Sequence, residues 1–214
     1  MKKLTIIFLL LLAGVLPLSS QEMPGGESPG FFDRLRFSCE WGYLQSLYTD
    51  WHYNILSEEG YRINERSYGL APHPNGLLLI GAGFVPPGDL MMISLHGGYS
   101  GIHEGNRIIP ALLRFSFFPK TVSADGIFCY AQAGAGFHIP KTFKTRVSTI
   151  AGLGAGYRFA FTRRCSLDLM LNVSGARSKP PIPNPDGPGY VDEKNIRSNS
   201  AGYLEVGLTI SVNI

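Results

Sequence analysis

The strongest constraint in this sequence is a strict two-residue alternation of apolar and polar side chains at its C-terminal end. Even-numbered positions from Leu204 to Ile214 are all apolar, and the positions between them include Glu205, Thr209 and Asn213. Successive side chains of a β-strand point to opposite faces, so this segment predicts a strand with one wholly apolar face. On a helix the same residues would spread apolar and polar groups over every side.

The same alternation recurs upstream in segments separated by turns or loops. Each segment is close to the 9–11 residues that a tilted membrane-spanning strand needs. The segment 77–84 is the least regular, because both of its faces are apolar or Gly. We therefore expect eight strands, at 34–44, 77–84, 90–99, 107–118, 127–137, 151–161, 166–174 and 203–214.

Composition favours a membrane barrel over other sheet proteins. Charged residues make up only 16% of the chain, whereas Gly (26 residues) and aromatic residues (12%) are abundant. Beyond the N-terminal segment, no apolar run approaches the length of a spanning helix, and only helices and closed barrels satisfy their backbone hydrogen bonds in lipid. A soluble β-sandwich or lipocalin-like barrel would carry more Lys and Glu on its polar face. We therefore predict an all-β fold: an eight-stranded antiparallel up-and-down transmembrane β-barrel over 34–214.

The N-terminus has the order of a secretory signal peptide. Lys2 and Lys3 precede an apolar run from Leu4 to Leu18, and small Ser residues follow. We expect a signal peptide at 1–20, a periplasmic N-terminal segment at 21–33 and a location in the cell outer membrane. Removal of residues 1–20 leaves 17 basic and 16 acidic residues, a net charge of +1, which gives no electrostatic reason to expect a nucleic-acid partner.

The connections between the expected strands alternate in length. The long ones are 45–76, 100–106, 138–145 and 176–199, and the shorter ones are 85–89, 119–125 and 162–164. Long loops outside and short turns in the periplasm are typical of outer-membrane barrels. Aromatic residues gather at both ends of the strands, as two interfacial girdles would: Phe84, Phe115, Phe117, Phe159 and Phe161 at the periplasmic end, and Trp41, Tyr43, Tyr99 and Phe137 at the outer end.

Three segments carry a resemblance to a known family. The run Arg107-Ile-Ile-Pro-Ala-Leu-Leu-Arg-Phe-Ser-Phe-Phe-Pro119, the following Tyr130–Phe137 and the Gly/Ala-rich strand at 151–157 resemble porin-like outer-membrane β-barrel-domain proteins of Gram-negative envelopes. The resemblance implies a small eight-stranded barrel and is nearly silent on function. Many such barrels end in Phe, whereas this chain ends in Ile214.

The polar faces of the strands carry balanced charges, namely Arg36, Glu40, Arg114, Arg158, Asp168 and Glu205. An eight-stranded barrel is just wide enough inside for side chains, and buried charges must pair. We expect a structural ion-pair network that plugs the lumen, with Gly residues making room for the Arg side chains; the alternative is a narrow ion-conducting path. A tight turn centred on residue 163 sets Arg158 opposite Asp168, so the sequence predicts that this pair is in contact.

No catalytic, cofactor-binding or metal site is expected. The five His residues (His52, His73, His96, His103 and His138) are expected on the outer side without metal-ligand spacing, and Gly152–Gly156 lacks the helix of a nucleotide-binding loop. Cys39 and Cys129 fall on opposite sides of the barrel, so no disulfide is expected. Some small barrels are lipid-modifying enzymes with a Ser near the outer rim, where Ser174 and Ser200 lie, but neither has a His nearby in sequence.

The sequence thus favours a non-catalytic envelope or surface-interaction protein. Its expected partners are outer-membrane lipid and lipopolysaccharide, and an extracellular ligand bound through loops 45–76 and 176–199, with the protein itself a monomer. The alternatives are an enzyme that modifies lipid or lipopolysaccharide and a narrow channel.

Overall fold

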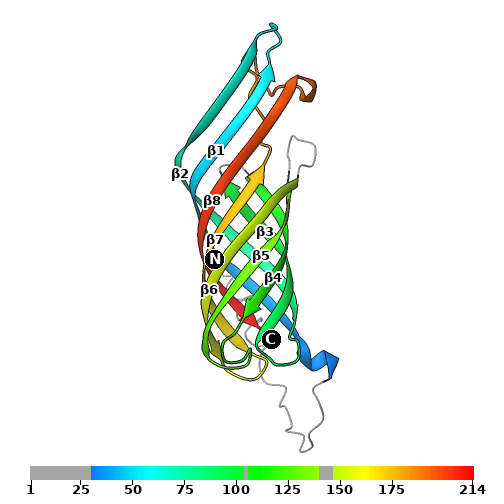
Figure 1. Ribbon diagram of the computed structural model, residues 1–214, viewed down its shortest axis with the longest axis vertical. Helices are drawn as coiled ribbons and strands as arrows, with labels where there is room; N and C mark the ends of the chain where they lie inside the picture. Colours follow the sequence, from blue (N-terminus) through cyan, green and yellow to red (C-terminus); the bar gives the residue numbers. More distant parts are fainter. Residues whose placement is uncertain (1–29, 104–105, 140–146) are drawn as a thin grey trace, which may run out of the picture.

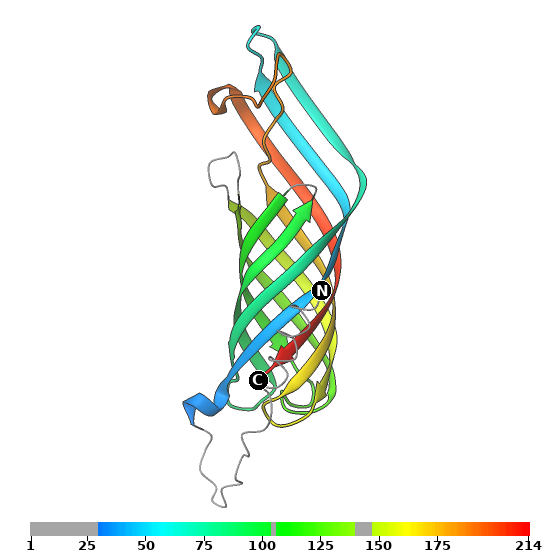
Figure 2. The same ribbon diagram turned by 180° about the vertical axis from the view of Figure 1, so that it is seen from behind.

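The alternating segments of the sequence form antiparallel strands that close into a barrel. The computed structural model describes residues 30–103, 106–139 and 147–214. Consecutive strands pair with each other, and the last strand pairs with the first, as Figure 1 and the view from behind in Figure 2 show. The strands are β1 (Leu35–Leu56), β2 (Arg62–Phe84), β3 (Met91–His103), β4 (Asn106–Phe117), β5 (Gly126–His138), β6 (Val147–Ala160), β7 (Ser166–Ser178) and β8 (Ile196–Asn213). The predicted eight-stranded up-and-down barrel is confirmed.

Two short 3₁₀ helices lie outside the wall. η1 (Phe31–Arg34) leads into β1, and η2 (Glu193–Asn195) leads into β8. Among the described residues, no helix has the length and apolar character needed to cross a membrane. The expected signal peptide at 1–20 and most of the expected periplasmic segment lie outside the described residues.

The two faces of the wall follow the predicted alternation. In β8, Leu204 and Leu208 are exposed on the outside, whereas Glu205 and Thr209 are buried inside. In β4 to β7 the odd-numbered residues face outward, and large apolar side chains there are exposed (Ile109, Leu113, Phe115, Phe117, Ile127, Leu153, Tyr157, Phe159, Leu169, Leu171 and Val173). A closed barrel with an apolar outer wall, a polar interior and short turns at one end is an outer-membrane-type barrel, whose short turns are periplasmic.

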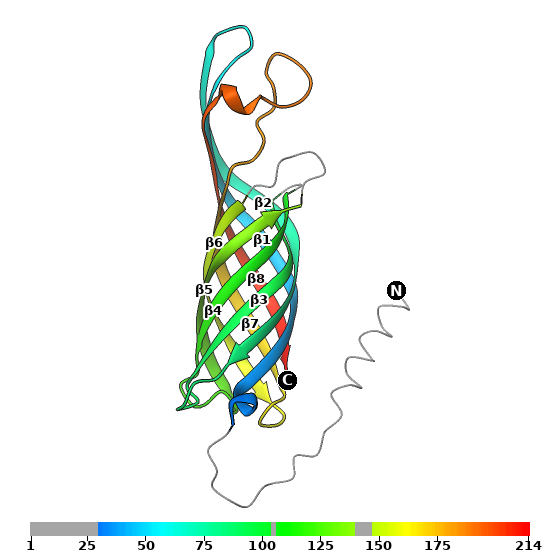
Figure 3. The same ribbon diagram turned by 90° about the vertical axis from the view of Figure 1, so that its right-hand side faces the viewer.

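Strands β1, β2 and β8 continue beyond the wall. β2 pairs with β3 only from Leu77 to Phe84, and the pairing of β7 with β8 ends at Ser178 and Ala201. Beyond these points, residues 62–76 of β2 and 196–200 of β8 pair only with β1, and together with residues 48–56 of β1 they form a three-stranded sheet, which we call the extension. Figure 3 shows the extension rising from one side of the barrel mouth, at the end opposite the short turns.

The extension corrects the predicted loop lengths. Most of the expected loop 45–76 is strand, and the turn between β1 and β2 spans only residues 57–61. The register of β1 shifts between Ser46 and Tyr48, so the alternation of apolar and polar residues reverses there, although the strand continues to Leu56. Pro72 and Pro74 lie in β2 where it forms an edge, and an edge strand tolerates residues without an N–H group.

Two of the other expected loops are also shorter than predicted. β3 reaches His103 and β4 begins at Asn106, so the expected loop 100–106 is mostly strand. β7 reaches Ser178 and β8 begins at Ile196, which shortens the expected loop 176–199 to residues 179–195. The expected loop 138–145 lies mainly outside the described residues.

Candidate functional site

The lower lumen, at the periplasmic end, contains the pair of charges that the turn at 163 predicts. Arg158 lies opposite Asp168 in the β6–β7 register. The two side chains meet side by side, with Nε 2.7 Å from Oδ1 and the second nitrogen 2.6 Å from Oδ2. Arg158 also donates to the carbonyl oxygen of Val122 at 2.8 Å, and its guanidinium stacks 4.4 Å from the ring centre of Phe118. Burial of both charges is therefore compensated by pairing and by further hydrogen bonds.

A second pair fills the middle of the lumen. Arg114 of β4 reaches across the barrel to Glu40 of β1, with contacts of 2.8 and 3.3 Å to the two carboxylate oxygens. Gln132 accepts hydrogen bonds from the same guanidinium, which also lies 4.4 Å from the ring centre of Tyr130. Both charged side chains are almost fully buried. The pair joins opposite sides of the wall, so it braces the barrel as well as filling it.

Two members of the expected network are not in ion pairs with the others. Glu205 is buried in the upper lumen, where Ser46 lies 3.2 Å from its Oε1 and Ser174 is its partner in the strand register. Among the described residues no Arg or Lys pairs with it. Arg36 lies at the periplasmic rim and donates to the carbonyl oxygens of Asp33, Leu35 and Arg163. The expected single network is therefore two separate ion pairs, because side chains at different heights in a narrow barrel do not meet.

Apolar side chains close the lower lumen around Arg158. The cluster comprises Val85, Met92, Phe118, Val122, Phe128, Tyr130 and Met170. Val85 and Val122 come from the short periplasmic turns, which fold into the barrel end. The Gly residues of β6 make room for aromatic rings here, not for Arg side chains as expected: a Cβ at Gly154 would overlap the ring of Tyr130, and one at Gly156 would meet Phe128.

The extension is tied to the segment that precedes β8. Asp186 accepts hydrogen bonds from the Ser57 hydroxyl at 2.5 Å, the Glu58 backbone N–H at 2.9 Å and the Tyr61 hydroxyl at 2.8 Å. These donors lie on the turn between β1 and β2. The hydrogen bonds from Ser57 and Tyr61 lower the pKa of Asp186, and the Asp186 carboxylate in turn raises the pKa of Tyr61. We call this group the Asp186 clamp.

The inner face of the extension is covered by the same segment. Ile182 is fully buried, and the Trp51 indole N–H donates to Asn199 at 3.0 Å. Asn199 also bonds to the carbonyl oxygen of Pro180. Residues 179–195 therefore form an ordered cover over one face of the sheet, whereas the other face remains open.

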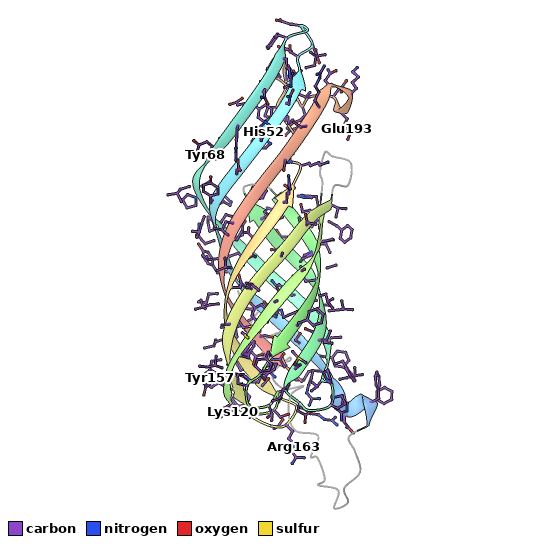
Figure 4. The ribbon with its side chains drawn as sticks, viewed as in Figure 1. His52, Tyr68, Lys120, Tyr157, Arg163 and Glu193 are labelled. Carbon is purple, nitrogen blue, oxygen red and sulfur yellow. The ribbon has the colours of Figure 1, made fainter. Side chains whose placement is uncertain are left out.

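The open face carries a band of polar residues just above the apolar wall. The strand registers set Ser200 of β8 opposite His52 of β1, and His52 opposite Arg66 of β2. His52 Nε2 lies 3.0 Å from Asn64 Oδ1, and Arg177 Nε donates to Ser200 Oγ at 2.9 Å. Figure 4 shows His52 and Tyr68 on the extension, far from Lys120 and Arg163 at the periplasmic end.

Several of the remaining residues of interest can now be placed. His96 lies inside the lumen, where its Nε2 is 2.8 Å from the Ser94 hydroxyl oxygen. His52 and His73 lie in the extension, and His138 ends β5. In the described part of the chain no three His, Cys, Asp or Glu residues gather as a metal site would require. The thiols of Cys39, Cys129 and Cys165 are all free.

Sequence patterns did not indicate the partners that pair across the barrel or between strands. Gln132 and Tyr130 lie on the polar face of β5, but only the closed barrel brings them to Arg114. His52 and Ser200 are far apart in sequence and meet because β8 closes onto β1. No sequence pattern indicated the Asp186 clamp, because it joins two segments that were both expected to be loops.

Comparison with known proteins gives no close relative. No protein-family model matches the chain, and no curated protein matches it either. Among solved structures, the outer membrane protein OprG from Pseudomonas aeruginosa aligns with 10% identity over 84% of this chain and 95% of that one, with a TM-score of 0.44. Ail, the attachment invasion locus protein of Yersinia pestis, aligns with 14% identity over 85% and 99% of the two chains, with a TM-score of 0.19. The assignment as an outer-membrane β-barrel rests on the wall, lumen and connections described above.

Proposed function

We propose that this protein is a non-catalytic outer-membrane β-barrel with a plugged lumen, whose extension serves as an extracellular platform for a surface ligand. The observation that carries the proposal is the contrast between the two ends of the molecule. The lumen is filled by ion pairs and aromatic side chains, whereas three strands continue well beyond the barrel wall. A long ordered segment outside the membrane favours a role in recognition over a role in transport.

The surface of the extension suits contact with another molecule. Tyr68 and Leu70 are 69% and 84% exposed, and Arg66 lies between them and the tip. Exposed aromatic and apolar side chains beside Arg are typical of binding surfaces. The Asp186 clamp and the buried Ile182 hold this surface in one conformation, which reduces the entropy lost on binding. We further propose that Arg158–Asp168 and Arg114–Glu40 serve structural roles and that the barrel acts as a monomer.

Planar-bilayer recording on the refolded protein tests the plugged lumen. We expect no stepwise conductance from the wild type. Replacement of both Glu40 and Arg114 by Ala removes the brace in the middle of the lumen and should give measurable current, because two large side chains and their charges are lost together. Conductance from the wild type would favour the narrow channel and contradict the proposal.

One observation favours a second candidate function, hydrolysis of lipid or lipopolysaccharide esters at the outer rim. Ser200 and His52 are cross-strand neighbours on the open face, and His52 is held by Asn64. A Ser beside an oriented His is the arrangement that nucleophilic ester cleavage requires. Their position at the upper edge of the apolar wall would bring membrane lipids within reach.

Mass spectra of lipids from expressing cells separate the two functions. A rim hydrolase would remove ester-linked acyl chains from lipid A or phospholipid in cells with the wild-type protein. The Ser200→Ala variant would abolish that change, while Ser198→Ala, on the same face of β8, would leave it. Lipid spectra that match those of cells without the protein support the non-catalytic function.

A further inference from the structure

The lipid-facing wall is hollowed where β5, β6, β7 and β8 run side by side below the extension. The hollow has a volume of about 610 Å³, and it is lined mainly by apolar atoms. Its floor and edges include Ala133, Ala151, Gly175, Gly202, Leu204 and Arg177. We call this feature the wall groove.

The strand registers explain why the wall is hollow there. Ala133 of β5 lies opposite Ala151 of β6, and Ala151 lies opposite Gly175 of β7. In the row below, Leu153 and Val173 project from the same strands and are 67% and 51% exposed. The floor of the groove is therefore recessed toward the barrel axis by about the length of one side chain, relative to the part of the wall nearer the periplasm. A Cβ at Gly175 would meet only the Tyr203 carbonyl oxygen, at 3.8 Å, so the space above this Gly is open.

A positively charged side chain, that of Arg177, lies at the upper edge of the groove. Arg177 is exposed, and in the part of the chain that the structure describes only Ser200 accepts a hydrogen bond from its guanidinium. Asp50 of β1 also lines the groove and lies in the same row as Arg177, but both of its carboxylate oxygens are bonded to Arg66, at 2.8 and 2.7 Å. Asp50 therefore does not neutralise Arg177, and the terminal nitrogens of Arg177 remain available to an anion.

The height of the groove identifies the occupant. Below it, Leu171 and Val173 belong to the apolar belt that faces the hydrocarbon, and above it the polar band of the extension begins. The groove thus crosses the level at which acyl chains give way to head groups. We propose that the wall groove binds one phosphorylated lipid of the outer leaflet, with an acyl chain over Ala151 and Gly175 and the phosphate at Arg177. Arg is the side chain best suited to bind phosphate, because its guanidinium can donate two parallel hydrogen bonds. The proposal rests on the outer-membrane location proposed above.

Native mass spectrometry of the refolded protein with dioleoyl phosphatidate tests the groove. Ala151→Leu fills the floor, and we expect the bound-lipid fraction to fall about tenfold. Ala155→Leu makes the same change on the same face of β6 outside the groove and should retain the lipid. Ala133→Leu fills the floor from β5 and provides a second test should Ala151→Leu not fold.

The phosphate contact has its own test. Arg177→Gln should reduce retention of phosphatidate about tenfold and leave retention of dioleoylglycerol, which has no phosphate, unchanged, whereas Arg163→Gln at the periplasmic rim should change neither. Equal retention by Ala151→Leu, Ala133→Leu and Ala155→Leu would overturn the groove, and equal retention by Arg177→Gln and Arg163→Gln would overturn the phosphate contact. Folding of each variant is checked by its heat-modifiable mobility, so failure of the barrel itself is distinguished from failure of the groove.

Discussion

At the scale of single residues, the Arg158–Asp168 pair makes the clearest prediction. Both side chains are almost fully buried. Asp168→Ala leaves the guanidinium uncompensated, and we expect a loss of about 3–5 kcal/mol in the free energy of unfolding. Adding Arg158→Ala should recover part of that loss. Urea unfolding in detergent measures the three variants, with Asp192→Ala, from the exposed Lys194–Asp192 pair, as a control that should change little.

The Asp186 clamp predicts a pH dependence confined to the extension. The pKa of Asp186 is lower in the folded protein than its ordinary value, so the clamp is intact above about pH 4 and is lost as pH falls through the folded-state pKa. The Glu58 N–H donates to Asp186, so its protection factor should then fall at acid pH. The protection factor compares its exchange rate with that of an unstructured peptide at the same pH. Asp186→Asn lacks the charge at every pH, and its exchange should no longer show this step. A step of equal size in both proteins would assign the titration to another group.

Residues paired by a tight turn could be predicted, and residues paired by barrel closure could not. The turn at 162–164 fixes the register of one hairpin and therefore the Arg158–Asp168 contact. Glu40 and Arg114 meet across the lumen, where the height of each strand decides the partner. Glu205 was expected to be paired because charges on the polar faces balance, but balance of charge along the sequence does not place opposite charges at the same height.

At the scale of strands, the different packing on the two faces of the wall predicts different responses at two Gly residues, Gly154 in β6 and Gly175 in β7. Gly154→Ala would place a Cβ against the ring of Tyr130 in the lumen, and overpacking should cost about 1–3 kcal/mol. Gly175→Ala places its Cβ in the open wall groove and should be tolerated. Both changes replace Gly by Ala within a strand, so the difference in unfolding free energy isolates the packing. Similar costs would show that the lumen is not packed at Tyr130.

The limits of the membrane along the strands give a second prediction at this scale. Leu208 is 55% exposed on the lipid-facing wall, and Leu70 is 84% exposed on the extension. Leu208→Lys should cost about 2–4 kcal/mol on unfolding from lipid vesicles, because it places a charge in the hydrocarbon. Leu70→Lys should cost almost nothing. A large cost at Leu70 would mean that lipid surrounds the extension as well.

Strand positions within the wall were predictable because a lipid-facing surface forces strict alternation. The ends of β1, β2 and β8 were not, because the extension is solvated on one face and covered on the other by residues 179–195. There both faces carry mixed residues, and the shift near Leu47 reverses the alternation. Loop lengths estimated from the loss of alternation are therefore too long wherever strands continue above a membrane.

At the scale of the whole molecule, the barrel is closed in two senses. The wall closes when β8 pairs with β1, and the lumen closes through two ion pairs and an apolar cluster. The parts open to other molecules are then the outside of the wall and the extension. Recognition of a surface ligand and binding of a lipid in the wall groove both follow from this division.

Heat-modifiable mobility in gel electrophoresis tests whether the alternating segments face lipid. The protein refolded into detergent or lipid vesicles should migrate differently in gel electrophoresis before and after boiling, and its circular dichroism should be rich in β-structure. In buffer without detergent it should fail to fold, because the apolar wall would be exposed to water. Efficient folding to a stable monomer in detergent-free buffer would contradict the account.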